Sequence, residues 1–134
     1  MKIVVIDSQG GGVGKAIIEK LIKLEKELDI IAIGTNALAT SAMLKAGAKK
    51  AATGENAIVV NSKDADIIIG PIGITIADSM LGEISSISAN GVASSNAKKI
   101  LIPFDNCGNT IVGLKDLKLN DLIDLAIKEV EKML

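Results

Sequence analysis

An apolar run, a cluster of glycines and a helical pattern follow one another at the start of the chain, and this order constrains the fold most. The run Lys2–Ile6 has the continuous apolar character of a strand that is covered on both faces. The glycines of Gly10–Gly14 come next, and apolar residues then recur at helical spacing up to about residue 28. A strand, a glycine turn and a helix in this order predict the first βα unit of an α/β fold.

Strand-like and helix-like segments alternate along the rest of the chain. Further strands are expected at residues 29–34, 49–53, 65–70 and 99–104. Further helices are expected at 36–45, at 55–61, within the mixed segment 74–97, and from about 116 onward. We therefore expect one domain over residues 1–134, a three-layer α/β/α Rossmann-like fold with a doubly wound, mainly parallel sheet in the order 3-2-1-4-5.

Three local signals refine this expectation. Asn36 is expected to cap the second helix, and Asp78 the helix within 74–97. The turn formers of 105–109 favour a hairpin, which would add an antiparallel edge strand at Thr110–Leu114.

Composition narrows the chemistry. All 15 cationic residues are lysines, the chain lacks Arg, His, Trp and Tyr, and its net charge is -1. The chain therefore lacks the residues that most often clamp a phosphate with two hydrogen bonds, act as imidazole acid–base catalysts or stack on nucleic-acid bases. We expect no nucleic-acid partner and no membrane partner. With the single Cys107 and no signal peptide or long apolar span, a cytoplasmic protein without a disulfide or a zinc site is expected.

The glycine run is the main candidate for a binding site. Free N–H groups at a helix N-terminus, together with the helix dipole, favour an anion such as phosphate. Glycines also follow two other expected strands, at Gly34 and at Gly70–Gly73, and a doubly wound sheet brings all these turns to one crevice. The candidate binding residues are Asp7, Gly10, Gly11, Gly12, Val13, Gly14, Lys15, Asn36, Gly70 and Gly73.

The run matches no nucleotide-binding template completely. In the dinucleotide pattern G-x-G-x-x-G, Lys15 stands where the third glycine belongs, and no acid ends the second strand. In the P-loop pattern, Gln9 replaces the first glycine and Ala16 replaces the magnesium-binding hydroxyl. The variant P-loop of the ParA and MinD type resembles Gly11–Lys15, but it also fails to match at Ala16. The sequence therefore does not identify a cofactor, and a nucleotide or dinucleotide is the class of ligand that we consider.

Four segments carry a resemblance to a known family, namely Ile6–Lys15, Thr53–Asn61, Ala65–Ile74 and Ala77–Ile84. Together they resemble a family of small clostridial proteins of unknown function, over essentially the whole chain. The resemblance implies a small soluble bacterial protein and assigns no residue a role.

Three hypotheses about function follow. The first is a sensor or carrier that binds a nucleotide or another phosphorylated metabolite at the glycine run. The second is an enzyme that acts on this ligand, with chemistry from Asp7, Lys15, Asp78, Glu83 or Cys107. The third is a homo-oligomeric assembly protein in which the run is only a turn.

Two residue roles stay open beside these hypotheses. Asp7 either contacts a ligand or metal ion, or it ties down the loop N–H groups or pairs with Lys15. Leu125 lies off the main apolar stripe of the last helix, and Ile74–Ile87 is more apolar than one helix face needs, so a homodimer is expected.

Overall fold

A five-stranded sheet lies at the centre of the molecule. The computed structural model describes residues 1–24, 26–104 and 107–134. The strand order is β3-β2-β1-β4-β5, and every pairing in this sheet is parallel. The strands are β1 (Lys2–Asp7), β2 (Asp29–Gly34), β3 (Lys50–Thr53), β4 (Ile67–Pro71) and β5 (Lys98–Ile102). The predicted α/β class and strand order are confirmed.

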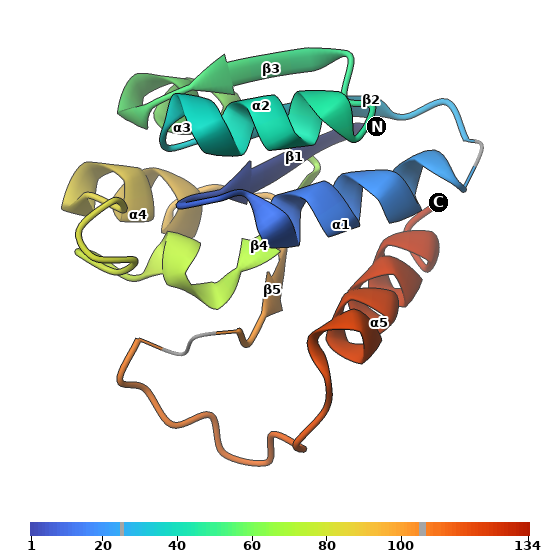
Figure 1. Cartoon of the computed structure of the whole chain (residues 1–134). Helices are drawn as coiled ribbons and strands as arrows, with labels where there is room; N and C mark the ends of the chain where they lie inside the picture. Colours follow the sequence, from blue (N-terminus) through green and yellow to red (C-terminus); the bar gives the residue numbers. More distant parts are fainter. Residues whose placement is uncertain (25, 105–106) are drawn as a thin grey trace.

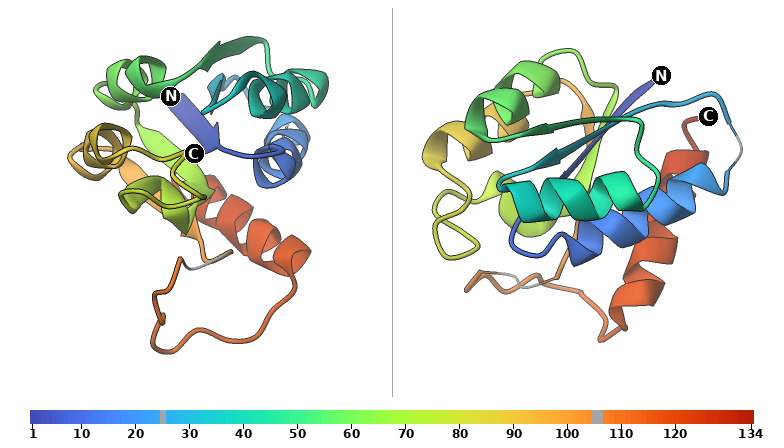
Figure 2. Two further views of the ribbon diagram at one scale, coloured as in Figure 1. Left: turned by 60° about the vertical axis from the view of Figure 1, so that its left-hand side comes forward. Right: turned by 45° about the horizontal axis from the view of Figure 1, so that its top comes forward.

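Helices cover both faces of the sheet (Figures 1 and 2). One face carries α1 (Gly12–Ile22), α2 (Ala37–Lys45) and α5 (Leu119–Glu131). The other face carries α3 (Glu55–Ser62), the short 3-10 helix η1 (Ile72–Thr75) and α4 (Ser86–Ala93). This arrangement is the one that right-handed crossovers produce when the winding reverses between β1 and β4.

The alternation of side chains along β1 divides the core into two halves. Ile3 and Val5 belong to the cluster that packs against α1 and α5, whereas Val4 and Ile6 pack against α3 and α4. All four of these side chains are fully buried. This burial on both faces explains why the strand reads as a continuous apolar run rather than as an alternating pattern.

The helix expected within 74–97 is shorter and begins later than predicted, because its start was placed near Asp78. The chain forms η1, then a series of turns at 76–84, and only then α4, which Ser85 caps by accepting a hydrogen bond from the N–H of Ser88. Asp78 is therefore no helix cap but has a left-handed backbone, with a φ of 63°. Met80 and Leu81 adopt the same conformation, with φ of 56° and 57°, which breaks any helix at this point.

The expected antiparallel strand at Thr110–Leu114 is also wrong, because these residues form a turn at 112–113 and irregular backbone, without a strand partner. Gly113 has a φ of 82°, which interrupts an extended run. Asp105 and Asn106, two residues of the expected hairpin turn, lie outside the described residues. On this side β5 is the edge strand of the sheet, and residues 107–118 lead to α5 (Figure 1).

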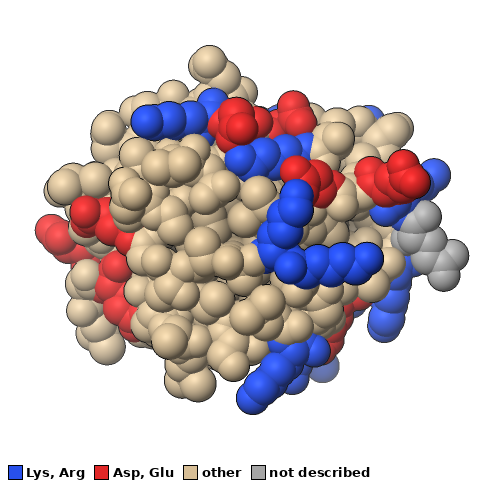
Figure 3. Space-filling view, turned by 90° about the horizontal axis from the view of Figure 1, so that it is seen from above, with Lys and Arg blue, Asp and Glu red and all other residues tan. Residues whose placement is uncertain are grey.

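Charged side chains are mixed on the face shown in Figure 3. Lysines and acidic residues stand near one another around a central area that is largely uncharged. This face therefore carries no continuous field of one sign. Within residues 1–24, 26–104 and 107–134, no helix combines the length and the apolar character needed to cross a membrane.

Candidate functional site

The loop between β1 and α1 is held by the carboxylate of Asp7. This side chain is only 4% exposed, and it accepts hydrogen bonds from the N–H groups of Ser8 at 2.8 Å and of Gly14 at 2.6 Å. Burial raises the pKa of Asp7 above its ordinary value, although the N–H groups of Gly14, Ser8 and Val13 act in the opposite direction. The predicted role of Asp7 in tying down the loop is confirmed, whereas no ion pair with Lys15 is found among the described residues.

Two of the loop glycines are required by the structure itself. Gly11 has a φ of 75°, and a Cβ there would lie 2.8 Å from the Cα of Ala39. At Gly14 a Cβ would lie 2.6 Å from the Sδ of Met43. These glycines let α1 pack closely on α2, which explains them without any ligand.

The other two loop glycines have no such reason. A Cβ built on Gly10 or on Gly12 meets nothing within 4 Å, and neither residue has a left-handed backbone. Both lie where the loop opens to a cavity. The glycine run therefore contains two residues that serve packing and two that the fold does not explain.

This cavity, which we call the loop cavity, has a volume of about 260 Å³. One wall is the loop itself, and the other is apolar, formed by Met80, Phe104 and Leu119. Phe104 is the only aromatic residue of the chain and is 44% exposed. Ser8 also lines the cavity, is 3% exposed, and its hydroxyl has no hydrogen-bond partner in the described part of the chain.

A second cavity of about 370 Å³ continues from the first, because Gln9 and Met80 line both. The turns at 76–81 form most of its wall, and Cys107 completes it. Gly73 lies nearby, since a Cβ at this position would be 3.4 Å from the Sγ of Cys107. The two cavities together border the carboxyl ends of β1, β4 and β5, where ligands bind in doubly wound sheets.

Glu83 reaches across the crevice from the turns at 76–84. Its Oε1 atom accepts hydrogen bonds from the N–H of Gln9 at 2.9 Å, the hydroxyl of Thr35 at 2.7 Å and the amide of Asn36 at 2.7 Å. Burial opposes ionisation, but these three donors hold the pKa of Glu83 below its ordinary value. The carboxylate thus ties the loop after β1 to the loop after β2.

The structure places the remaining predicted residues outside the two cavities. Asn36 caps α2 as expected, accepting a hydrogen bond from the N–H of Ala39 at 2.9 Å. Lys15 is exposed on the first turn of α1. Gly70 is buried inside β4, where a Cβ would lie 2.3 Å from the carbonyl oxygen of Ile6. Of the predicted residues, Asp7 and the segment Gly10–Val13 line the loop cavity.

Sequence reasoning missed the apolar wall and the bridging role of Glu83. The one usable signal was Phe104, because a single aromatic residue in a chain of 134 is conspicuous. Leu119 was expected only as part of the apolar face of the last helix. Among the described residues, no group of three or more acidic or cysteine side chains is placed to hold a metal ion.

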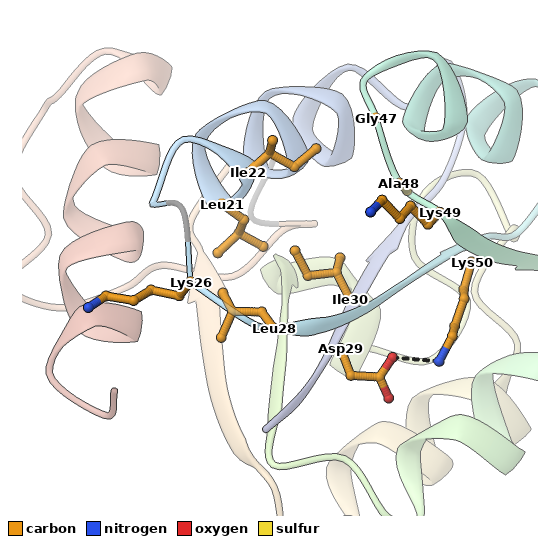
Figure 4. Close-up of a pocket in the computed structure, with 10 residues that line it drawn as sticks. All are labelled: Leu21, Ile22, Lys26, Leu28, Asp29, Ile30, Gly47, Ala48, Lys49 and Lys50. Carbon is orange, nitrogen blue, oxygen red and sulfur yellow. Dashed lines mark hydrogen bonds and ion pairs between the residues drawn. The ribbon is translucent and has the colours of Figure 1, made fainter.

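A further cavity of about 270 Å³ lies at the opposite side of the sheet, where the strands begin, beside the start of β2 and the end of α1 (Figure 4). Leu21, Leu28 and Ile30 give it an apolar wall. Lys50 at its rim forms an ion pair with Asp29, at 2.8 Å. Because α1 ends here, the helix dipole directs its negative end toward this cavity. This cavity is therefore a less favourable site for an anion than the loop cavity.

Comparisons with known proteins complete the description. No curated protein matches the chain. Among solved structures, a dodecameric FMN-dependent Ubix-like decarboxylase from Escherichia coli O157:H7 matches with a TM-score of 0.46 and 17% sequence identity, over 98% of this chain and 77% of that one. The model of a family without an assigned function matches residues 2–134. The chain therefore belongs to the family described as "Domain of unknown function (DUF3842)".

Proposed function

We propose that this chain binds a phosphorylated small molecule with a flat ring, a ligand of the nucleotide class, in the loop cavity. The observation that carries the proposal is the pair Gly10 and Gly12. Neither the backbone conformation nor the packing requires glycine at these positions. Glycine without such a need is expected where a ligand approaches the backbone closely.

The donors for a phosphate group lie at the same place. In the described part of the chain, the N–H groups of Gly11 and Gly14 donate to the carbonyl oxygen of Ser8 and the carboxylate of Asp7, while those of Gly10 and Gly12 have no hydrogen-bond partner. Free N–H groups at the start of an 11-residue helix favour an anion. The exposed ammonium group of Lys15 lies on the same first turn.

The buried hydroxyl of Ser8 supports a ligand independently of the helix. An unpartnered buried hydroxyl costs about 1–3 kcal/mol relative to a satisfied one. This group lies in the wall of the loop cavity. A phosphate or ribose oxygen in the cavity would satisfy it.

The apolar wall supports a ring at the other end of the ligand. Phe104 offers a face for stacking, and Met80 and Leu119 add flexible and branched apolar surface. A cavity of about 260 Å³ with a few polar groups on one side and apolar side chains on the other has the composition of small-molecule sites.

We favour a sensor or carrier over an enzyme. Asp7, the carboxylate that lines the loop cavity, holds backbone N–H groups, and Glu83 holds three donors from two loops, so both carboxylates serve the structure of the loops. A homo-oligomeric assembly protein is the second candidate. Leu81 and Val112, which are 96% exposed, favour it, because such side chains are candidates for burial between subunits.

Titration calorimetry with AMP, FMN and ribose 5-phosphate tests the proposal. We expect AMP or FMN to bind the wild type with a dissociation constant below about 1 mM, and the Gly12→Val variant to bind at least about tenfold more weakly. Ser86→Val is the matched control, because it places the same side chain at the exposed first residue of another helix, α4. It should bind like the wild type.

A further variant separates the contributions of side chain and backbone. If the N–H groups carry most of the recognition, Lys15→Ala should weaken binding by only about 1–3 kcal/mol. If neither AMP nor FMN binds, or if Gly12→Val binds as well as the wild type, the glycine run is a structural turn and the assembly protein becomes the better explanation.

A further inference from the structure

The carboxylate of Glu83 divides the crevice at the carboxyl edge of the sheet. It joins the N–H of Gln9, in the loop after β1, to Thr35 and Asn36, which follow β2. The amide of Asn36 also donates to the carbonyl oxygen of Gln9 at 3.0 Å. The two loops are therefore joined directly by hydrogen-bonded groups of the chain itself.

The open space lies on the other side of β1. The loop cavity and its continuation are lined by residues of β1, of the glycine loop, of the turns at 76–81 and of the segments near Phe104 and Leu119. No residue of β2 or α2 lines either cavity. The crevice is thus open toward β4 and β5 and closed toward β2.

This division bears on the size of the ligand. In dinucleotide-binding sheets the pyrophosphate lies over the first helix, and the adenosine ribose extends to the end of the second strand. Here that end is occupied by a carboxylate whose Oε1 already accepts three hydrogen bonds.

The carboxylate is held firmly in this position. The turns that carry it are closed by hydrogen bonds from the N–H of Asp78 to the carbonyl of Ile84, at 2.7 Å, and from the N–H of Ile84 to the carbonyl of Ser79, at 3.3 Å. The hydroxyl of Ser79 in turn donates to the carbonyl oxygen of Gly73 at 2.5 Å. A ligand would have to break several hydrogen bonds to displace Glu83.

We infer that Glu83 is a specificity-determining residue that restricts this site to mononucleotides and excludes dinucleotides. The inference rests on the proposed function, since it assigns a size class to the ligand of the same cavity. One phosphate lies at Gly10–Gly12 and one ring lies against Phe104. The place of a second nucleotide is taken by Glu83 and its three donors.

Calorimetry with two matched pairs of probes tests this inference, AMP against NAD and FMN against FAD. Each dinucleotide contains the mononucleotide with which it is compared. For the mononucleotide that binds the wild type, we expect its dinucleotide to bind at least about tenfold more weakly. This comparison needs no variant and does not depend on the folding of one.

The variant Glu83→Ala then tests the residue. It should bind the dinucleotide at least about tenfold more tightly than the wild type does, while the affinity for the mononucleotide changes by less than about threefold. Glu83→Gln keeps the size and one acceptor oxygen but removes the charge, and it replaces the alanine variant if that variant fails to fold. Glu131→Ala, which removes an exposed acid at the end of α5, is the control and should match the wild type.

The possible failures are distinguishable. If AMP and FMN both fail to bind, the proposed function is wrong, and this inference falls with it. If a mononucleotide binds but its dinucleotide binds the wild type equally well, the function stands and the size restriction is wrong. If neither Glu83 variant improves dinucleotide binding, the role assigned to Glu83 is wrong.

Discussion

Two alanine substitutions within one helical turn should have opposite effects on stability. At Gly14 a new Cβ would lie 2.6 Å from the Sδ of Met43 and 2.9 Å from the Cβ of Asp7. Met43 is fully buried, and Asp7 belongs to β1 and holds the N–H of Gly14 itself. The clash therefore cannot be relieved by moving one exposed side chain. Overpacking of this kind costs about 1–3 kcal/mol.

At Gly12 the same methyl group meets nothing within 4 Å. Replacing glycine by alanine within a helix favours the folded state by up to about 1 kcal/mol, and this gain applies in part at both positions. The free energies of unfolding of Gly12→Ala and Gly14→Ala should therefore differ by about 1–3 kcal/mol, with Gly14→Ala the less stable. Urea unfolding followed by circular dichroism measures this difference. The packing explanation of Gly14 is refuted if Gly14→Ala is as stable as Gly12→Ala.

Three further predictions concern charge, stacking and assembly. Because burial raises the folded-state pKa of Asp7 above 3.8, its contribution to stability is largest below that value and is lost as the pH rises through the folded-state pKa. Urea unfolding at a series of pH values should thus show the wild type gaining stability relative to Asp7→Asn on acidification; a constant difference would contradict the assignment. Phe104→Ala should weaken AMP or FMN binding by about 1–3 kcal/mol and leave ribose 5-phosphate unaffected in calorimetry, and an equal loss for all three would argue against stacking. Ile87 and Leu125 are 58% and 47% exposed, so light scattering at micromolar concentration should give the mass of a dimer, and a monomer mass would count against self-association.

The fold was predictable where the signal is local. Asn36 before an alanine-rich helix is a cap because its side chain reaches an N–H three residues later, and the structure confirms this bond. The parallel order follows from strands that alternate with helices and from the handedness of crossovers. For Asp7, at the end of a buried strand and before a helix, the sequence left two roles open, and the structure shows it binding the loop N–H groups.

The errors arise where the outcome depends on distant partners or on unusual backbone. The run Thr110–Leu114 is apolar enough for a strand, but no neighbouring strand pairs with it, and pairing is what defines a strand. In 74–97 the helical pattern was interrupted by Asp78, Met80 and Leu81 in the left-handed region. Non-glycine residues rarely adopt this conformation, so the sequence carries no signal for it beyond Gly82.

The candidate site was predictable in part for the same reason. The glycines are visible in the sequence, but which of them serve packing depends on Ala39 and Met43 in α2. Glu83 lies 48 residues from Thr35 in the chain, and nothing near it in the sequence indicates the contact. Its carboxylate reaches the loop after β2 from a turn on the other side of the crevice.

The most direct test of ligand binding in the loop cavity is a titration followed by two-dimensional ¹H–¹⁵N NMR. Addition of the mononucleotide that binds most tightly should shift the amide resonances of Gly10 and Gly12 and of residues near Phe104. The amides of Leu28 and Lys50, at the cavity on the opposite side of the sheet (Figure 4), should stay unchanged. Shifts confined to that opposite side, or resonances of Gly10 and Gly12 that do not move at saturating ligand, would contradict the account.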